Sequence, residues 1–240
     1  MRLPSPDIPL FLIGLALGPA FAQERPSTPA PAPAMPAQER TPVVSGFGMA
    51  ATGEAIPEAL RSAGPDTPCW VRLTAGRADL DDPTRLVAAL DAARGRGLLV
   101  LVRLTDADWQ PVEPWFARLQ GLARAAGNRV DAWQFLGAGA PEWVEAREYS
   151  YLVKQARVAI RSGGSEAAIV SAPLPDDPGW IESIFAEDAG PYLDVLAASD
   201  PAALAAVVAA RDRLHGRAPV WITDAPIAAD RPGAFAVRDA

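Results

Sequence analysis

Three tryptophans stand shortly after apolar runs that predict β-strands: Trp109, Trp143 and Trp180. A flat indole face with one N–H donor suits a half-wet cleft, and sugar rings commonly pack on such faces. The same residues also suit packing beneath loops, because partly buried tryptophan is common at protein surfaces. These positions therefore predict either a carbohydrate platform or loop packing. The remaining tryptophans are expected mainly in the core: Trp70, Trp115, Trp133 and Trp221.

Other residue types that could bind metals or cofactors give weak signals. Asp106, Asp108, Asp176 and Asp177 follow predicted strands, but without further ligand spacing such acids are more typical of solvated loops and helix caps than of calcium sites. The chain has a single histidine, which excludes the common histidine-based zinc sites, and a single cysteine, which excludes an internal disulfide. We predict no metal and no cofactor.

A glycine pair in the sequence GAGAPE also resembles the start of a dinucleotide-binding loop. Gly137 and Gly139 have the spacing of its first two glycines, but Glu142 takes the place of the third. A carboxylate at that position would oppose the negative pyrophosphate. A nucleotide site is therefore not predicted.

Short runs rich in β-branched or aromatic residues recur along the chain, and helical segments separate them. Asp-Pro pairs at Asp82, Asp177 and Asp200 predict helix starts, since aspartate caps a helix and proline fits its first turn. Near-continuous apolar strands indicate a sheet covered on both faces. The predicted strands are VVSGFGM (43–49), CWVRL (69–73), LLVLVRL (98–104), VDAWQFL (130–136), AAIVSA (167–172), YLDVLAA (192–198) and PVWITDA (219–225).

Strand and helix alternate as successive βα units require, so we predict an α/β fold with a parallel sheet. The preferred architecture is a (β/α)8 TIM-like barrel, pruned or incompletely closed at the C-terminal end. A full barrel typically needs about 250 residues, and only roughly 200 are available here. The run AFAV at 234–237 is a candidate short eighth strand.

The N-terminal region predicts export. Residues 1–22 combine an early arginine, a short apolar run and small residues before Gln23, as in a cleaved secretory signal, and the run is too short for a stable membrane span. Residues 23–42 form a Pro/Ala-rich linker, and residues 43–240 form the barrel domain. The net charge of −7 disfavours nucleic acid. We expect a periplasmic or extracellular protein.

Several motifs follow one another in a familiar order: CWVRL with Arg72, WQFLGAGAPEW, the continuation EYSYLVKQARVAIRSGGSEAAIVSAPL, and PVWITDAP. Over about Gly46 to Pro226 they resemble the clan A glycoside hydrolases, which are retaining (β/α)8 barrels. The resemblance implies that Arg72 lies near the end of the second strand and that Asp224 occupies the nucleophile position of the seventh.

The same resemblance implies that the catalytic positions of this chain differ from those of the active enzymes. The acid/base falls on Ala138 or Ala140 depending on register, so neither alignment supplies a carboxylate. Glu142 is the nearest substitute, although it stands four residues after Ala138 and two after Ala140. Asp224 is one methylene shorter than the usual glutamate, and a displacement of about 1 Å can cost on the order of a hundredfold in rate. Retaining hydrolysis needs both carboxylates.

We therefore predict an exported glycoside-hydrolase-like protein, a non-catalytic pseudoenzyme, that binds an oligo- or polysaccharide at the barrel mouth. Arg72, Trp109, Trp143 and Trp180 would contact the glycan. Two alternatives stay open. One is an active retaining hydrolase with relocated carboxylates, Asp224 as nucleophile and Glu142 as acid/base. The other is an envelope scaffold with a protein partner that covers an open barrel edge.

Overall fold

The computed structural model describes residues in the compact unit Arg40–Ala240. For 46–51, 69 and 234–237 it describes the backbone alone. The predicted signal and linker, and the boundary at residue 43, lie outside the described residues and stay predictions. The described ranges are 46–51, 69–105, 111–136, 144–174, 177–214, 216–223 and 234–237.

The strands form one eight-stranded sheet in the order β7-β6-β5-β4-β3-β2-β1-β8. Every neighbouring pair from β1 to β7 is parallel, as the alternating pattern predicted. The order follows the sequence, so each βα unit adds the next strand at the same edge. The bounds are β1 Gly46–Ala51, β2 Cys69–Ala75, β3 Leu99–Leu104, β4 Ala132–Phe135, β5 Ala168–Leu174, β6 Val195–Ala198, β7 Val220–Ile222 and β8 Ala234–Val237.

The eighth strand exists, but its direction differs from that of a regular barrel. β8 pairs antiparallel with β1, with Phe47 opposite Ala236, and β7 also contacts β8. A parallel return after β7 would need a crossover of a dozen or more residues, whereas an antiparallel return needs only a loop. The ten residues between Thr223 and Ala234 are too few for that crossover. The fold is thus a partial TIM-like α/β barrel.

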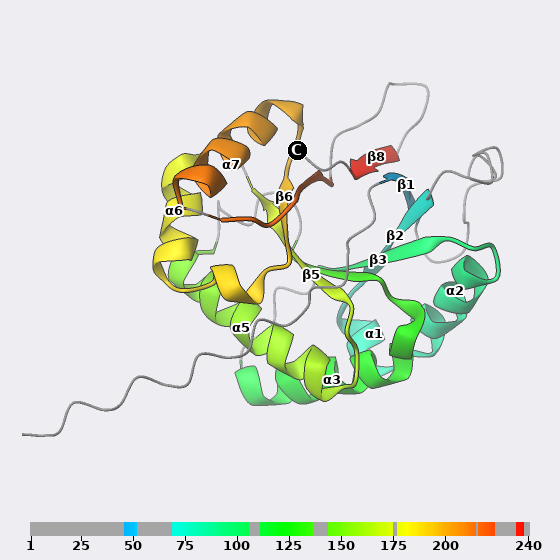
Figure 1. Cartoon of the computed structure of the whole chain (residues 1–240). Coiled ribbons are helices and arrows are strands. Elements are labelled where there is room, and N and C mark those ends of the chain that lie inside the picture. Colours follow the sequence, from blue (N-terminus) through cyan, green and yellow to red (C-terminus); the bar gives the residue numbers. More distant parts are fainter. Residues whose placement is uncertain are drawn as a thin grey trace, which may run out of the picture. The chain divides into compact units, whose positions relative to one another are not determined.

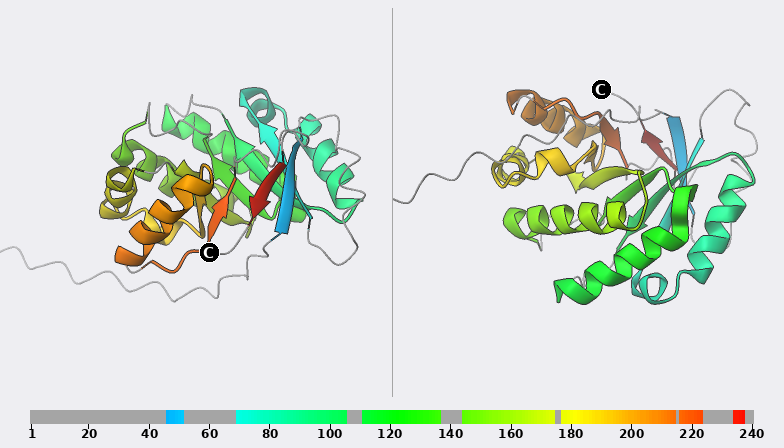
Figure 2. Two further views of the ribbon diagram at one scale, coloured as in Figure 1. Left: turned by 90° about the horizontal axis from the view of Figure 1, so that it is seen from above. Right: turned by 60° about the horizontal axis from the view of Figure 1, so that its bottom comes forward.

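Helices lie outside the curled sheet (Figures 1 and 2). As predicted, Asp177 and Asp200 cap α6 and α7, and their carboxylates accept backbone N–H groups of the first turn. Asp82 also accepts a backbone N–H at the start of a helix, that of Thr84 in α2. The N-cap residue of α2 is Pro83, one residue after Asp82. None of the described helices combines the length and apolar character of a membrane span. The helices are α1 Arg77–Asp81, α2 Thr84–Arg94, α3 Val112–Ala126, α5 Ala146–Ser162, α6 Pro178–Ala186 and α7 Pro201–Arg213, with 3-10 turns η2 Gly127–Arg129 and η3 Gly190–Tyr192.

An aspartate before β4 and another before β6 secure the amino ends of the strands in the same way. Asp131 accepts the Val100 N–H of β3 at 2.6 Å and Arg94 Nη2 of α2 at 2.9 Å. Asp194 accepts the Ile169 N–H of β5 at 2.9 Å and bonds to arginine from α5. Each carboxylate therefore ties its own strand to the neighbouring strand and to an outer helix.

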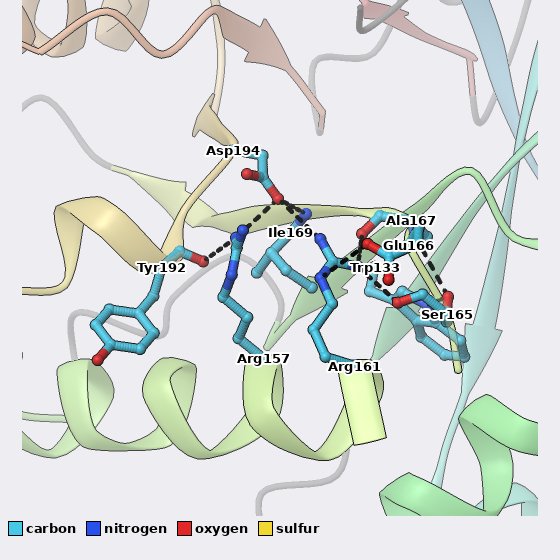
Figure 3. A network of polar contacts seen from close by, with 9 residues as sticks. All are labelled: Trp133, Arg157, Arg161, Ser165, Glu166, Ala167, Ile169, Tyr192 and Asp194. Atoms are coloured by element: carbon cyan, nitrogen blue, oxygen red, sulfur yellow. Dashed lines mark hydrogen bonds and ion pairs between the residues drawn. The ribbon is translucent and has the colours of Figure 1, made fainter. Parts of the chain in front are cut away.

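The Asp194 cluster is the larger of the two (Figure 3). Its Oδ2 lies 2.9 Å from Arg157 Nη1 and 3.6 Å from Arg161 Nη2. Arg161 also donates to the carbonyls of Ser165 and Ala167. Burial, followed by the like charge of Arg157, lowers the pKa of Arg161. The Asp194 carboxylate thus offsets the repulsion between two arginines one helical turn apart, and Glu166, 3.6 Å from Arg161 Nε, adds a second, exposed carboxylate.

We expect Asp194→Asn to lower the free energy of unfolding by about 3 kcal/mol, since it keeps an acceptor for the Ile169 N–H but removes the buried carboxylate that two largely buried guanidinium groups share, leaving only the exposed Glu166 near Arg161. Asp131→Asn, which faces one arginine, should cost about 1–2 kcal/mol. Urea unfolding of both variants measures the difference. Equal losses in the two variants would contradict this account of the cluster.

Candidate functional site

The interior of the curled sheet begins with an apolar layer. Because side chains alternate along a strand, every second residue points inward. The apolar layer consists of Trp70, Leu101, Ala132, Val170, Val195, Ala197 and Trp221, which form a cluster separate from the helix-covered core. Trp70 of β2 and Trp221 of β7 meet edge to face, with ring centroids 5.1 Å apart. Strands five places apart in the sheet therefore touch across its interior.

A second layer stands two residues further toward the carboxyl ends, and this layer is polar. Arg72 follows Trp70, Arg103 follows Leu101, Gln134 follows Ala132, and Thr223 follows Trp221, in each case by two positions. We call these four residues the polar layer. Barrel enzymes hold their active sites at this end of the strands.

Direct hydrogen bonds join the polar layer. Arg103 Nε donates to Gln134 Oε1 at 2.8 Å, and Gln134 Nε2 donates to Thr223 Oγ1 at 3.1 Å and to the Ser171 carbonyl at 2.9 Å. Gln134 and Thr223 are fully buried, and Arg103 is 7% exposed. Buried polar networks of this kind are rigid when their members are bonded. Side chains from β3 and β4 are thereby fixed to the end of β7.

Arg72 links β2 to the same point. Its Nη1 donates to the Thr223 carbonyl. That carbonyl belongs to the peptide group that joins Thr223 to Asp224, the predicted nucleophile position. Arg72 itself stands in the middle of β2, Cys69–Ala75, so its predicted role in binding stays a prediction, and Asp224 lies outside the described residues.

Backbone strain marks the carboxyl end of β4. Leu136 has φ of 65°, a left-handed conformation that is unusual for a bulky residue. Its side chain is buried, and its N–H donates to the Leu104 carbonyl at 2.8 Å. The chain bends at Leu136, immediately before residues 137–143, GAGAPEW, which lie outside the described residues. Local packing and this hydrogen bond hold the strained residue in place.

Carboxylates described near this end of the sheet have structural partners. Asp79 is 2% exposed, accepts the Gly76 N–H at 2.9 Å and pairs with Arg85 at 2.6 Å. Asp177 and Asp200 cap α6 and α7. The residues that the structure describes contain no group of three or more His, Cys, Asp or Glu side chains suited to hold a metal ion.

The predicted sugar-binding tryptophans are tested only in part. Trp180 follows β5 as predicted and belongs to the first turn of α6. Asp177 and Pro178 start that helix before the tryptophan is reached. The half-buried indole Nε1 donates to the Val144 carbonyl at 3.4 Å, and the ring lies 5.2 Å from Tyr149, whose pKa burial raises. Trp109, Trp143 and Glu142 lie outside the described residues.

Three residues of the polar layer were not predicted from the sequence: Arg103, Gln134 and Thr223. A signal for two of them was present, because Arg103 and Gln134 are the polar members of otherwise apolar runs, LVLVRL and AWQF. Their spacing of two from an inward apolar residue would have placed them on the interior face. Thr223 gave no such signal, since threonine is common in strands.

Comparison with known proteins identifies no family. No family model matches the chain, and no curated protein matches it by sequence. Among solved structures the chain is similar to the GH53 catalytic domain of Ignisphaera aggregans, with a TM-score of 0.45 and 15% identity. The match covers 64% of this chain and 56% of that domain, so the chain spans about half of the GH53 domain. A likeness at this level says nothing about activity.

We expect Gln134→Leu to lower the free energy of unfolding by about 3 kcal/mol, because it leaves a buried guanidinium N–H, a hydroxyl and a carbonyl without their partner. Gln120→Leu is the matched control, since this amide makes one exposed bond to the Ser162 carbonyl, and it should change stability by less than about 0.5 kcal/mol. Urea midpoints measure both. A neutral Gln134→Leu would show that the polar layer does not tie the strands together.

Proposed function

We propose that the protein is an exported, glycoside-hydrolase-like barrel that binds a glycan at the carboxyl ends of its strands and does not hydrolyse it. The observation that carries the proposal is the polar layer. Four inward side chains from β2, β3, β4 and the end of β7 lie where ligands of such sheets bind.

The chemistry of the polar layer suits a polyhydroxylated ligand. Arginine supplies only donors, whereas glutamine and threonine both donate and accept, so the layer can bond hydroxyl groups of either polarity. The internal bonds of the layer also hold its side chains in place before a ligand arrives. Less conformational entropy is then lost on binding.

Absence of hydrolysis follows from the sequence at the catalytic positions. A retaining mechanism needs one carboxyl group as acid and another as nucleophile, about 5 to 5.5 Å apart. The strand that should deliver the acid is followed by Gly137, Ala138, Gly139 and Ala140, none of which can transfer a proton. Asp79, Asp177 and Asp200 support the proposal because they are already engaged by an arginine or by helix N-termini. A nucleophile position alone does not complete the reaction.

Thermal melting of the full chain against a panel of oligosaccharides tests the binding proposal. A bound ligand at about 100 times its Kd adds roughly 2.7 kcal/mol, which raises the Tm by about 5 °C or more in a domain of this size. Asp224→Ala should reduce that rise because it removes a polar group from the mouth. Asp212→Ala, an exposed acid near the end of α7, is the matched control and should keep it.

Two results would contradict the proposal and favour one of the alternative functions. Unchanged melting curves across neutral and acidic sugars would reject glycan binding and favour a protein partner. Turnover of a bound sugar that disappears in both Asp224→Ala and Glu142→Ala would instead establish the hydrolase with relocated carboxylates.

A further inference from the structure

Strand β5 contains one extra residue beside β6. Val170 pairs with Val195, whereas Pro173 pairs with Ala197, so β5 advances by three residues where β6 advances by two. A bulge of this kind releases backbone groups from the ladder, and bulges are frequent next to functional sites. Pro173 suits the irregular position because it has no backbone N–H to donate.

The peptide group that joins Ser171 to Ala172 is turned out of the sheet at this bulge. Its carbonyl accepts a hydrogen bond from Gln134 Nε2 at 2.9 Å, and its N–H donates to the Tyr149 hydroxyl. Gln134 belongs to the polar layer inside the curled sheet, whereas Tyr149 belongs to α5 in the helix layer outside it. One peptide group therefore bonds to the interior with one end and to an outer helix with the other.

The Ser171 hydroxyl replaces the ladder bond that its turned carbonyl gives up. It accepts the Ala197 N–H of β6 at 2.8 Å and donates to the Ala172 carbonyl at 2.7 Å. Ser171, Gln134 and Tyr149 are all fully buried, so water cannot take the place of a lost bond at these groups. The turned peptide is therefore held in one orientation by bonds on both faces of the sheet.

We infer that Tyr149 is a positioning residue for the polar layer. Its hydroxyl holds the N–H of the turned peptide, and the carbonyl of that peptide holds the Gln134 amide. The same amide bonds to Arg103 and Thr223, so the outer helix sets the orientation of side chains inside the sheet. Only the effect of Tyr149 on ligand affinity rests on the proposed function.

The ring of Tyr149 and its helix are secured by contacts that do not involve the hydroxyl. The ring lies 5.2 Å from that of Trp180 in α6, and Arg157 ties α5 to Asp194 at the start of β6. The hydroxyl is therefore presented to β5 from a fixed position. Removing the oxygen alone tests positioning, because the ring packing and the helix are kept.

Tyr149→Phe removes the acceptor of the Ala172 N–H and keeps the ring. In the full chain labelled with 15N-glutamine, the side-chain amide signals of Gln134 should shift in this variant. Their hydrogens should exchange with water at least about tenfold faster, because the peptide that holds them is released. Tyr192→Phe is the matched control: it removes the hydroxyl of a ring that lies beside Lys154, and the Gln134 signals should stay unchanged.

A double-mutant cycle measures the same link by urea unfolding. Tyr149→Phe and Gln134→Leu act on the two ends of one peptide group, so their combined effect on the folding equilibrium should be smaller than the product of the single effects by about fivefold or more. Tyr192→Phe combined with Gln134→Leu should show no such coupling. In Gln134→Leu the Ala172 N–H should also exchange faster relative to the amides of α7, which provides a second variant if Tyr149→Phe does not fold.

The outcomes separate this inference from the proposed function. Gln134 signals that stay in place in Tyr149→Phe, or losses in the cycle that are independent, overturn the positioning role and leave Tyr149 as a packing residue. If a sugar binds, Tyr149→Phe should raise its Kd by roughly twofold to thirtyfold, whereas Tyr192→Phe should not. Failure of every sugar to bind rejects the proposed function, while the signals and the cycle, both measured without ligand, still decide the role of Tyr149.

Discussion

The contact between β2 and β7 across the interior is the constraint on which the rest of the structure depends. In a flat sheet these strands would stand five positions apart, and their side chains would never meet. The Trp70–Trp221 pair and the bond from Arg72 to the Thr223 carbonyl require the sheet to curl. Curling gathers inward side chains from β2, β3, β4 and β7 at one point. The bonds among the polar-layer residues exist only because the sheet bends this far.

The two ends of the strands have different chemistry. At the amino ends, Asp131 and Asp194 join each strand to its neighbour and to an outer helix through charged pairs that are satisfied within the chain. At the carboxyl ends, the described bonds of the polar layer run through amide, hydroxyl and carbonyl groups, and Arg72 and Arg103 have further interactions besides these. Barrels commonly divide stability and function between their ends in this manner.

Much of the fold could be predicted from the sequence, because the relevant signals are local. Apolar runs located β1 to β7, and Asp-Pro pairs located the starts of α6 and α7. The direction of β8 could not be predicted, since it depends on how little chain remains after β7. The short helix α1 was also missed, because it begins after Gly76 with a cap formed by Asp79, a residue of the helix itself.

The candidate site was predicted less completely than the fold. Arg72 was singled out from the sequence and bonds to the Thr223 carbonyl, whereas Arg103 and Gln134 were overlooked although each is a polar residue in an apolar strand. Trp180 belongs to the first turn of α6, and the Asp177-Pro178 pair that predicts the start of this helix already placed it there. Contacts such as Gln134 with Thr223 join residues far apart in the sequence, and no local pattern encodes them.

The most direct test of the polar layer as a ligand site is an NMR titration that follows the Nε–H signals of isotope-labelled arginine. The ligand is the oligosaccharide that stabilises the full chain most, and lysine variants assign the signals. The account predicts that Arg72 and Arg103 shift on binding while Arg94 and Arg157, which pair with Asp131 and Asp194, stay unchanged. Binding that leaves the Arg72 and Arg103 signals in place, or that shifts only arginines of the outer helices, would contradict it.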